Sequence, residues 1–268
     1  MVDSRDQTGD QTEERMDTAH WDAIAEDFER QFSRSDYRRL MVEKITVFSN
    51  ETVLDVGCGP GTLAIPLAHT AKNVTALDIS AAMLRVGWTR AAEEGVTNIC
   101  FMQADWNEVV PGKTVPLHDV VVCSRALPGH DLEMALSRVD ESARRRVYVT
   151  VRSGPDESER FYEELHKELG LPPSRRRSTD RECLHLLRRL GIRAEVEPII
   201  YTDSFRYSHA ADAFRVLGSH VPIKTAEQEA AFMRFIQRNM DRNGRFELDI
   251  ESRWAVLSWE KAGWNPGT

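Results

Sequence analysis

Apolar residues gather in seven runs of strand length, and segments with helical spacing separate most of them. The runs lie at 53–56, 73–78, 99–104, 119–123, 147–151, 192–201 and 251–260. Short runs rich in Val and Ile predict β-strands, and apolar positions three or four residues apart predict amphipathic helices. This alternation predicts an α/β fold, a doubly wound and mainly parallel seven-stranded sheet with helices on both faces.

The same pattern predicts how the chain is divided. Residues 1–13 are polar and acidic without a period, which predicts a disordered tail. Residues 14–47 carry two amphipathic helices, which we interpret as an N-terminal lid. The core is then 48–202 together with 251–268, and the helical segment 203–250 is predicted to form a cap inserted between strands six and seven.

The stretch TVLDVGCGPGTLAIPLA, residues 52–68, reads as a strand, a tight loop and a helix. Gly57, Gly59 and Gly61 allow backbone conformations that side chains disfavour. The following helix would direct its free N–H groups back over the strand tip, an arrangement typical of nucleotide sites. The dinucleotide fingerprint needs its third glycine at position 62, which is Thr62 here, so the spacing is G-x-G-x-G.

Acidic residues end the next two predicted strands. Asp78 follows Gly61 by 17 positions, close to the offset of about 20 at which a carboxylate accepts hydrogen bonds from ribose hydroxyls. Ser80 is placed to cap the next helix. Asp105 and Trp106 follow the third strand, where a carboxylate can accept from an amino group while an indole covers an aromatic face.

Asp55, the three glycines and Asp78 together resemble motif I and its partner acid in the class I S-adenosylmethionine-dependent methyltransferases. This resemblance implies the strand order 3-2-1-4-5-7-6 with an antiparallel last strand, S-adenosyl-L-methionine as cofactor and methyl transfer as the activity. It places Asp105 beside the adenine amino group. Two alternatives remain open, since Met83 and Trp106 fit either cofactor contact or plain core. The cofactor-binding candidates are Asp55, Gly57, Cys58, Gly59, Gly61, Thr62, Asp78, Ile79, Met83, Asp105, Trp106 and Ser124.

The loop after the fourth strand, 124–131, is expected to meet the acceptor, because ligands of open parallel sheets bind outside the strands' carboxyl ends. Its catalytic candidates are Arg125 and His130. Arg125 could bind a carboxylate or simply pair with a neighbouring acid, and His130 could act as a general base or cap the next helix. In the resembling class, enzymes acting on planar amides or adenine carry a [DNS]-P-P-[YF] tetrapeptide here, which this chain lacks.

Composition narrows the partners. The net charge of −8 and pI of about 5.6 argue against a nucleic-acid substrate and favour a small molecule. The four cysteines form no C-x-x-C pair, and nothing in the sequence requires a metal. No apolar run is long enough to span a membrane, so we expect a cytoplasmic protein. Two alternatives stay open: a cofactor-binding regulatory module without turnover, and an RNA or protein methyltransferase that uses the basic runs 144–146 and 175–177. The sequence leaves the oligomeric state open.

Overall fold

A computed structural model describes residues 18–32, 36–127, 131–154, 156–173, 179–218, 221 and 223–261. The predicted tail at 1–13 lies outside these residues. Seven strands form one sheet in the order β3-β2-β1-β4-β5-β7-β6, which confirms the predicted order. The strands are β1 (Thr52–Val56), β2 (Asn73–Asp78), β3 (Ile99–Gln103), β4 (His118–Ser124), β5 (Ala143–Arg152), β6 (Glu195–Tyr207) and β7 (Phe246–Glu260). The first five pair in parallel, and β7 runs antiparallel to both β5 and β6.

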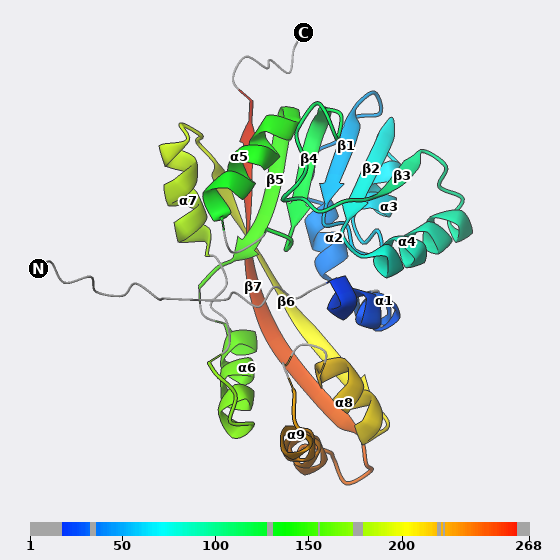
Figure 1. Cartoon of the computed structure of the whole chain (residues 1–268), viewed down its shortest axis with the longest axis vertical. Helices are drawn as coiled ribbons and strands as arrows, with labels where there is room; N and C mark the ends of the chain where they lie inside the picture. The colour runs from blue at the N-terminus through cyan, green and yellow to red at the C-terminus, as the bar shows by residue number, and fades with distance from the viewer. Residues whose placement is uncertain are drawn as a thin grey trace, which may run out of the picture.

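Helices cover both faces of the sheet (Figure 1). One face packs against α2, α3 and α4, and the other against α5 and α7. The helix α1 lies on α4 near the carboxyl ends of the parallel strands. The helices are α1 (Thr18–Phe32), α2 (Tyr37–Val42), α3 (Ala64–Ala68), α4 (Ala81–Glu93), α5 (Leu132–Ser142), α6 (Glu157–Glu168), α7 (Asp180–Arg189), α8 (Ala210–Gly218) and α9 (Ala226–Arg238).

The centre of the sheet is apolar on both sides. In β4, the four residues from Val120 to Cys123 are all fully buried. Val120 and Val122 belong to the apolar cluster on the α3 face, and Val121 belongs to the cluster on the α5 face. An unbroken apolar run is what a strand covered on both faces requires, so the sequence pattern and the layer structure agree.

Beyond the sheet, β6 and β7 continue as a long antiparallel pair that ends at Tyr207 opposite Phe246. Both strands are therefore longer than the sequence pattern predicted, and the inserted segment is confined to 208–245. The reason is alternation at the start of β7, where Phe246 and Ile250 are buried and Glu247 and Asp249 are exposed. This end of the hairpin extends past the carboxyl ends of the parallel strands, and α6, α8 and α9 pack around it there (Figure 1). We call α8, α9 and this end of the hairpin the cap.

The basic run 144–146 lies inside β5. Arg146 is buried and forms an ion pair with Glu51, which is itself fully buried. Arg145 reaches Glu51 at 3.3 Å and Asp119 at 3.4 Å. Two buried charges stay ionised only when they are paired, so these arginines serve the fold.

Candidate functional site

The glycine loop runs from the end of β1 to α3 at the carboxyl edge of the sheet. Gly57, Gly59 and Gly61 all have positive φ, at 67°, 54° and 75°. The Gly57 and Cys58 N–H groups donate to the Leu77 carbonyl at 2.8 and 2.9 Å, which ties the loop to β2. A Cβ on Gly57 would lie 2.3 Å from the Cβ of Ala126, so the loop after β4 packs directly on the glycine loop.

Asp78 ends β2 beside this loop. Its Oδ2 accepts from the Gly59 N–H at 2.8 Å, and its Oδ1 accepts from the Ser80 N–H at 2.9 Å. Burial raises the pKa of Asp78, and these two N–H groups and that of Ile79 oppose the rise. A carboxylate has about four acceptor positions. Backbone N–H groups therefore occupy part of the acceptor capacity of Asp78 and leave part of it for a ligand hydroxyl.

Asp55 is the second buried acid of the site. It is 1% exposed, and its Oδ2 has no hydrogen-bond partner among the described residues. Burial and the neighbouring Asp78 charge raise the pKa of Asp55 to about 7, against the effect of an N–H from Ala64. The hydroxyl of Thr62 is likewise buried and without a partner in the described part of the chain. Such orphaned polar atoms are costly unless a ligand satisfies them.

Three other candidates on this side have mainly packing contacts. Cys58 is 4% exposed, and burial raises the pKa of its thiol well above the ordinary value. The Ile79 carbonyl accepts from the Gln103 amide at 3.1 Å. Met83 is 2% exposed and packs among apolar residues of α1 and α4. The Met83 side chain therefore lies in the apolar core, which is one of the two alternatives that the sequence left open.

Asp105 and Trp106 separate in the structure. Asp105 opens a turn after β3 and accepts from the Asn107 N–H at 2.9 Å and from its amide at 2.7 Å. Trp106 is 7% exposed in the apolar cluster that holds Leu54 and Val56. The indole thus lies in the core, although its Nε1 is buried without a partner among the described residues.

Ser124, at the end of β4, meets a residue from the N-terminal helices. The Tyr37 hydroxyl lies 2.6 Å from the Ser124 hydroxyl and 2.9 Å from that of Thr150. Tyr37 is 1% exposed, and burial raises its pKa. Three hydroxyls from α2, β4 and β5 therefore join the N-terminal helices to the expected acceptor side.

Arg125 follows Ser124 with a φ of 58° and is the one non-glycine residue with positive φ in the described ranges. Its guanidinium lies 4.1 Å from the centre of the Tyr37 ring and donates to the Tyr201 hydroxyl at 3.3 Å. Its backbone N–H donates to Thr150 at 2.9 Å. A strained backbone held by several contacts is common at functional sites. His130, the other catalytic candidate, lies outside the described residues.

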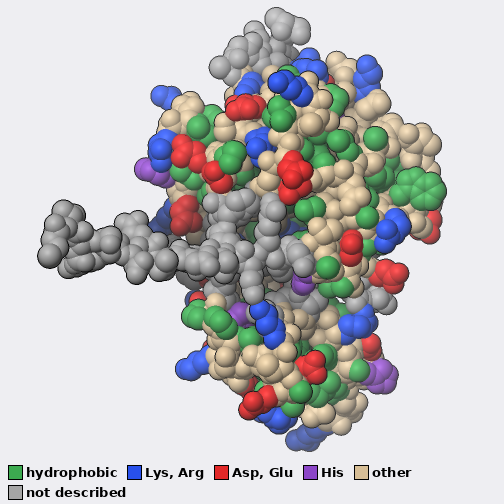
Figure 2. All heavy atoms as spheres, viewed as in Figure 1, with side chains coloured by type: hydrophobic (Ala, Val, Ile, Leu, Met, Phe, Trp, Pro, Cys, Tyr) green, Lys and Arg blue, Asp and Glu red, His purple; other side chains and the backbone are tan. Residues whose placement is uncertain are grey.

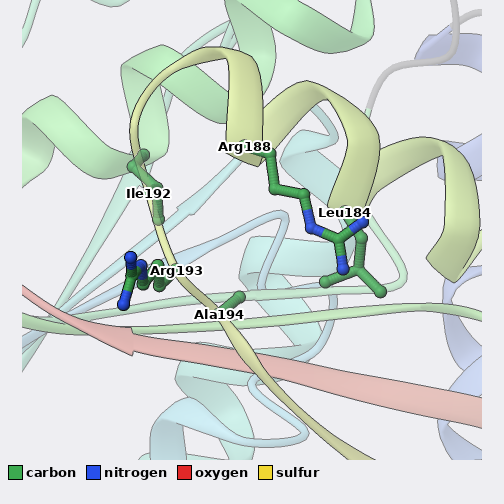
Figure 3. A pocket seen from close by; sticks show the side chains of 5 residues that line it. All are labelled: Leu184, Arg188, Ile192, Arg193 and Ala194. Carbon is green, nitrogen blue, oxygen red and sulfur yellow. The ribbon is translucent and has the colours of Figure 1, made fainter.

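Two clefts open on the described surface, and neither coincides with the glycine loop. One lies between α1 and α4 and includes Arg215 of α8 in its lining. The other is lined by α7 and the segment that leads into β6, where two arginines flank apolar side chains (Figure 3). Figure 1 places α7 far across the sheet from α1 and α4.

Comparison with known proteins bears on the class. Residues 53–145 match the family model of a methyltransferase domain. The chain is 28% identical over 234 residues to an uncharacterized protein of Haemophilus influenzae, covering 84% of this chain and 82% of that protein. It is 39% identical over 87 residues to the ubiquinone biosynthesis O-methyltransferase of Rickettsia felis, covering 31% of this chain and 34% of that enzyme. The crystal structure of the YcgJ protein of Bacillus subtilis matches with a TM-score of 0.59 at 18% identity, covering 84% of this chain and 97% of that one.

The strand order, the glycine loop and the domain match agree with one another. Residues 53–145 match a methyltransferase domain, and the strand order of the sheet is the one that the resemblance to the class I S-adenosylmethionine-dependent methyltransferases implies. The resemblance found in the sequence is thus confirmed, and S-adenosyl-L-methionine is the cofactor of the class. Among the described helices, none combines the length and apolar character needed to cross a membrane.

Sequence reasoning missed three residues that the structure brings to the site: Asp22, Tyr37 and Thr150. Asp22 lies in the first amphipathic helix predicted within 14–47, where the apolar spacing indicates a helix but gives no role to an acid. Tyr37 looked like one more apolar position of a helix. No local signal in the sequence shows that its hydroxyl reaches residues about 87 and 113 positions away.

Proposed function

We propose that this methyltransferase binds S-adenosyl-L-methionine across the glycine loop and transfers its methyl group to a small-molecule acceptor in the cytoplasm. The observation that carries the cofactor assignment is the buried Asp55 carboxylate with an unpartnered Oδ2, beside a loop that backbone N–H groups fix to β2. Asp78 would hold the ribose hydroxyls, and Asp105 the adenine amino group. Asp55 and Thr62 would face the amino-acid end of the cofactor, whose ammonium supplies the cation a buried carboxylate needs.

The cofactor supplies an activated methyl group and its own leaving group. The protein therefore contributes alignment of the acceptor with the methyl group and exclusion of water. Arg125 is the residue proposed to orient the acceptor, because three aromatic or hydroxyl contacts fix its guanidinium near the end of β4. His130 is proposed as a base for an oxygen or nitrogen acceptor.

The acceptor is proposed to be a small molecule rather than RNA. One of the similar proteins is a ubiquinone biosynthesis O-methyltransferase. The similarity covers only about a third of that enzyme, so it supports the cofactor assignment more than the choice of acceptor. Arg145 and Arg146 are committed to ion pairs within the fold, and 175–177 lies outside the described residues. Positive and negative side chains are interspersed over the described part of the face shown in Figure 2. An RNA substrate would favour a continuous basic surface.

The cofactor assignment is tested by substituting Asp78. We expect Asp78→Ala to weaken S-adenosylhomocysteine binding by about 2 kcal/mol, roughly 30-fold in Kd, because hydrogen bonds to a charged acceptor are lost. Calorimetry measures this Kd, and the control is Glu108→Ala, which removes an exposed carboxylate from the segment after β3. Unchanged binding by Asp78→Ala would refute the ribose role.

Turnover separates the enzyme from a regulatory module that binds the cofactor without reaction. We expect S-adenosylhomocysteine to form when the protein, S-adenosylmethionine and a fractionated small-molecule extract are combined. Product formation that requires the macromolecular RNA fraction instead would favour the RNA alternative. If no fraction yields product, the regulatory module without turnover is favoured over the enzyme.

A further inference from the structure

The N-terminal helix α1 is joined to the cofactor side of the sheet by one carboxylate. Asp22 Oδ1 accepts from the Ser80 hydroxyl at 2.6 Å and from the Ala82 N–H at 3.0 Å. The Ser80 hydroxyl also accepts from the Met83 N–H at 3.1 Å, so it caps α4 from within the chain. Asp22 is thus a second cap on α4, and it is supplied by a different helix.

These bonds continue into the glycine loop. The Ser80 N–H donates to Asp78, and the other oxygen of Asp78 accepts from the Gly59 N–H. A chain of four hydrogen-bonded groups therefore runs from Asp22 on α1 through Ser80 and Asp78 to Gly59. Every link is between 2.6 and 2.9 Å. Displacing α1 would leave the Ser80 hydroxyl and the Ala82 N–H without these bonds.

Apolar contacts place α1 over the same region. A Cβ built on Gly59 would lie 3.8 Å from the Phe28 ring, so Phe28 lies next to the loop. Ile24 and Ala25 are buried against Ala82 and Met83 at the start of α4. Trp21 packs edge-on against Phe28, with ring centres 6.3 Å apart. Hydrogen bonds on one side and apolar contacts on the other hold α1 across the start of α4 and the loop.

We propose that Asp22 is a positioning residue that latches α1 closed over the bound cofactor. This inference rests on the proposed cofactor site, and it adds a part that the glycine loop and Asp78 do not provide. Ser80 donates its hydroxyl to Asp22 and its backbone N–H to Asp78. The closed position of α1 and the orientation of the Asp78 carboxylate therefore stabilise each other. Ordered closure of a segment over a ligand lowers the ligand's dissociation rate and excludes water.

The test compares three variants by calorimetry with S-adenosylhomocysteine. We expect Asp22→Ala to raise its Kd about tenfold, as for the loss of charge-assisted hydrogen bonds. Asp22→Asn keeps an acceptor oxygen and should recover most of the affinity. Glu26→Ala removes another exposed carboxylate from the same helix and should bind as wild type. An equal loss in Glu26→Ala would indicate a general charge effect and overturn the latch.

Hydrogen exchange of the ligand-free protein gives an independent readout. The latch predicts faster exchange at the Ala82 amide and along α1 in Asp22→Ala, with the β4 and β5 amides unchanged. Unchanged exchange at Ala82, or an unchanged Kd in Asp22→Ala while wild type binds, would refute the latch. Absence of binding by wild-type protein would instead refute the proposed cofactor site, so the two failures are distinguishable.

Discussion

The two regions at the carboxyl edge of the sheet differ in what is buried there. Around the glycine loop, Asp55 and Asp78 are both buried, and the loop itself needs positive φ at three residues. The cap instead packs with α6 around a separate apolar cluster, to which α6, α8, α9 and the far end of the β6 and β7 hairpin all contribute. The first region, which is the proposed cofactor site, buries two acids at some cost in stability, and the second buries apolar side chains that stabilise it.

The cost on the cofactor side has a physical origin. Two carboxylates close together disfavour each other's ionised forms, and burial disfavours both. The pKa of Asp55 is raised to about 7 for these reasons. Among the described residues, no buried charged side chain lies in α8 or α9. This difference predicts that the regions respond separately to substitution and to pH.

The largest expected effect comes from the cap core. Phe232 is fully buried in α9 and stacks with Phe235 at a centroid distance of 6.3 Å. Phe232→Ala removes a buried aromatic ring and should cost about 3 to 5 kcal/mol of local stability. Hydrogen exchange should show α8 and α9 opening more readily while S-adenosylhomocysteine binds with wild-type affinity. Loss of binding to the same degree would mean that the two regions unfold as one unit.

A smaller effect is expected at Gly57, where the glycine loop meets the loop after β4. Gly57→Ala places a side chain at a left-handed backbone position, which costs about 1 to 2 kcal/mol. The new Cβ would also lie 2.3 Å from the Cβ of Ala126. We expect S-adenosylhomocysteine binding to fall sharply in calorimetry.

The control is Gly95→Ala, which has a φ of 70° and nothing within 4 Å of the new Cβ. It carries the backbone strain alone and should bind as wild type. The double variant Gly57→Ala with Ala126→Gly should recover part of the binding, since it removes the clash and keeps the strain. If the double variant binds no better than Gly57→Ala, contact between the loops is not what limits binding.

The smallest effect is a pH dependence at Asp55. The pKa of its carboxyl is about 7 in the folded protein and 3.8 as the ordinary value. A pKa raised by folding means that the contribution of Asp55 to stability is present below about pH 4 and declines until about pH 7. A cation beside Asp55 favours the ionised form, so S-adenosylhomocysteine should bind about tenfold more tightly at pH 8 than at pH 6.

Asp55→Asn should remove this pH dependence of binding and flatten the decline in melting temperature between pH 4 and 7. Calorimetry in two buffers of different ionisation enthalpy should also show less than one proton released per wild-type binding event near pH 7, and none from the variant. A wild-type affinity that is the same at pH 6 and pH 8 would show that Asp55 does not face the cation.

Local patterns were sufficient to predict most of the fold. The strand runs and the Ser80 cap of α4 depend on neighbours in sequence, and the structure shows both. The far ends of β6 and β7 were missed because their alternation is short and half polar. The burial of Arg146 could not be predicted, because its partner Glu51 is 95 residues away.

The candidate site divides in the same way. The glycines and Asp78 could be picked out from the sequence because their roles are local. The glycines adopt positive φ, and Asp78 accepts hydrogen bonds from backbone N–H groups of the loop and of the residues that follow it. Which of Met83 and Trp106 faces a ligand depends on how α1 and α5 pack, and the structure places both side chains in apolar clusters. Asp22 and Tyr37 act through contacts with distant strands and helices, so no spacing within the sequence indicates them.

The most direct measurement is a crystal structure of the protein with S-adenosylhomocysteine. We expect the ribose hydroxyls at Asp78, the ammonium at Asp55 Oδ2 and α1 closed with Asp22 bonded to Ser80. Density for the ligand in the cleft between α1 and α4, or in the one beside α7, with an unoccupied glycine loop, would contradict the proposed cofactor site.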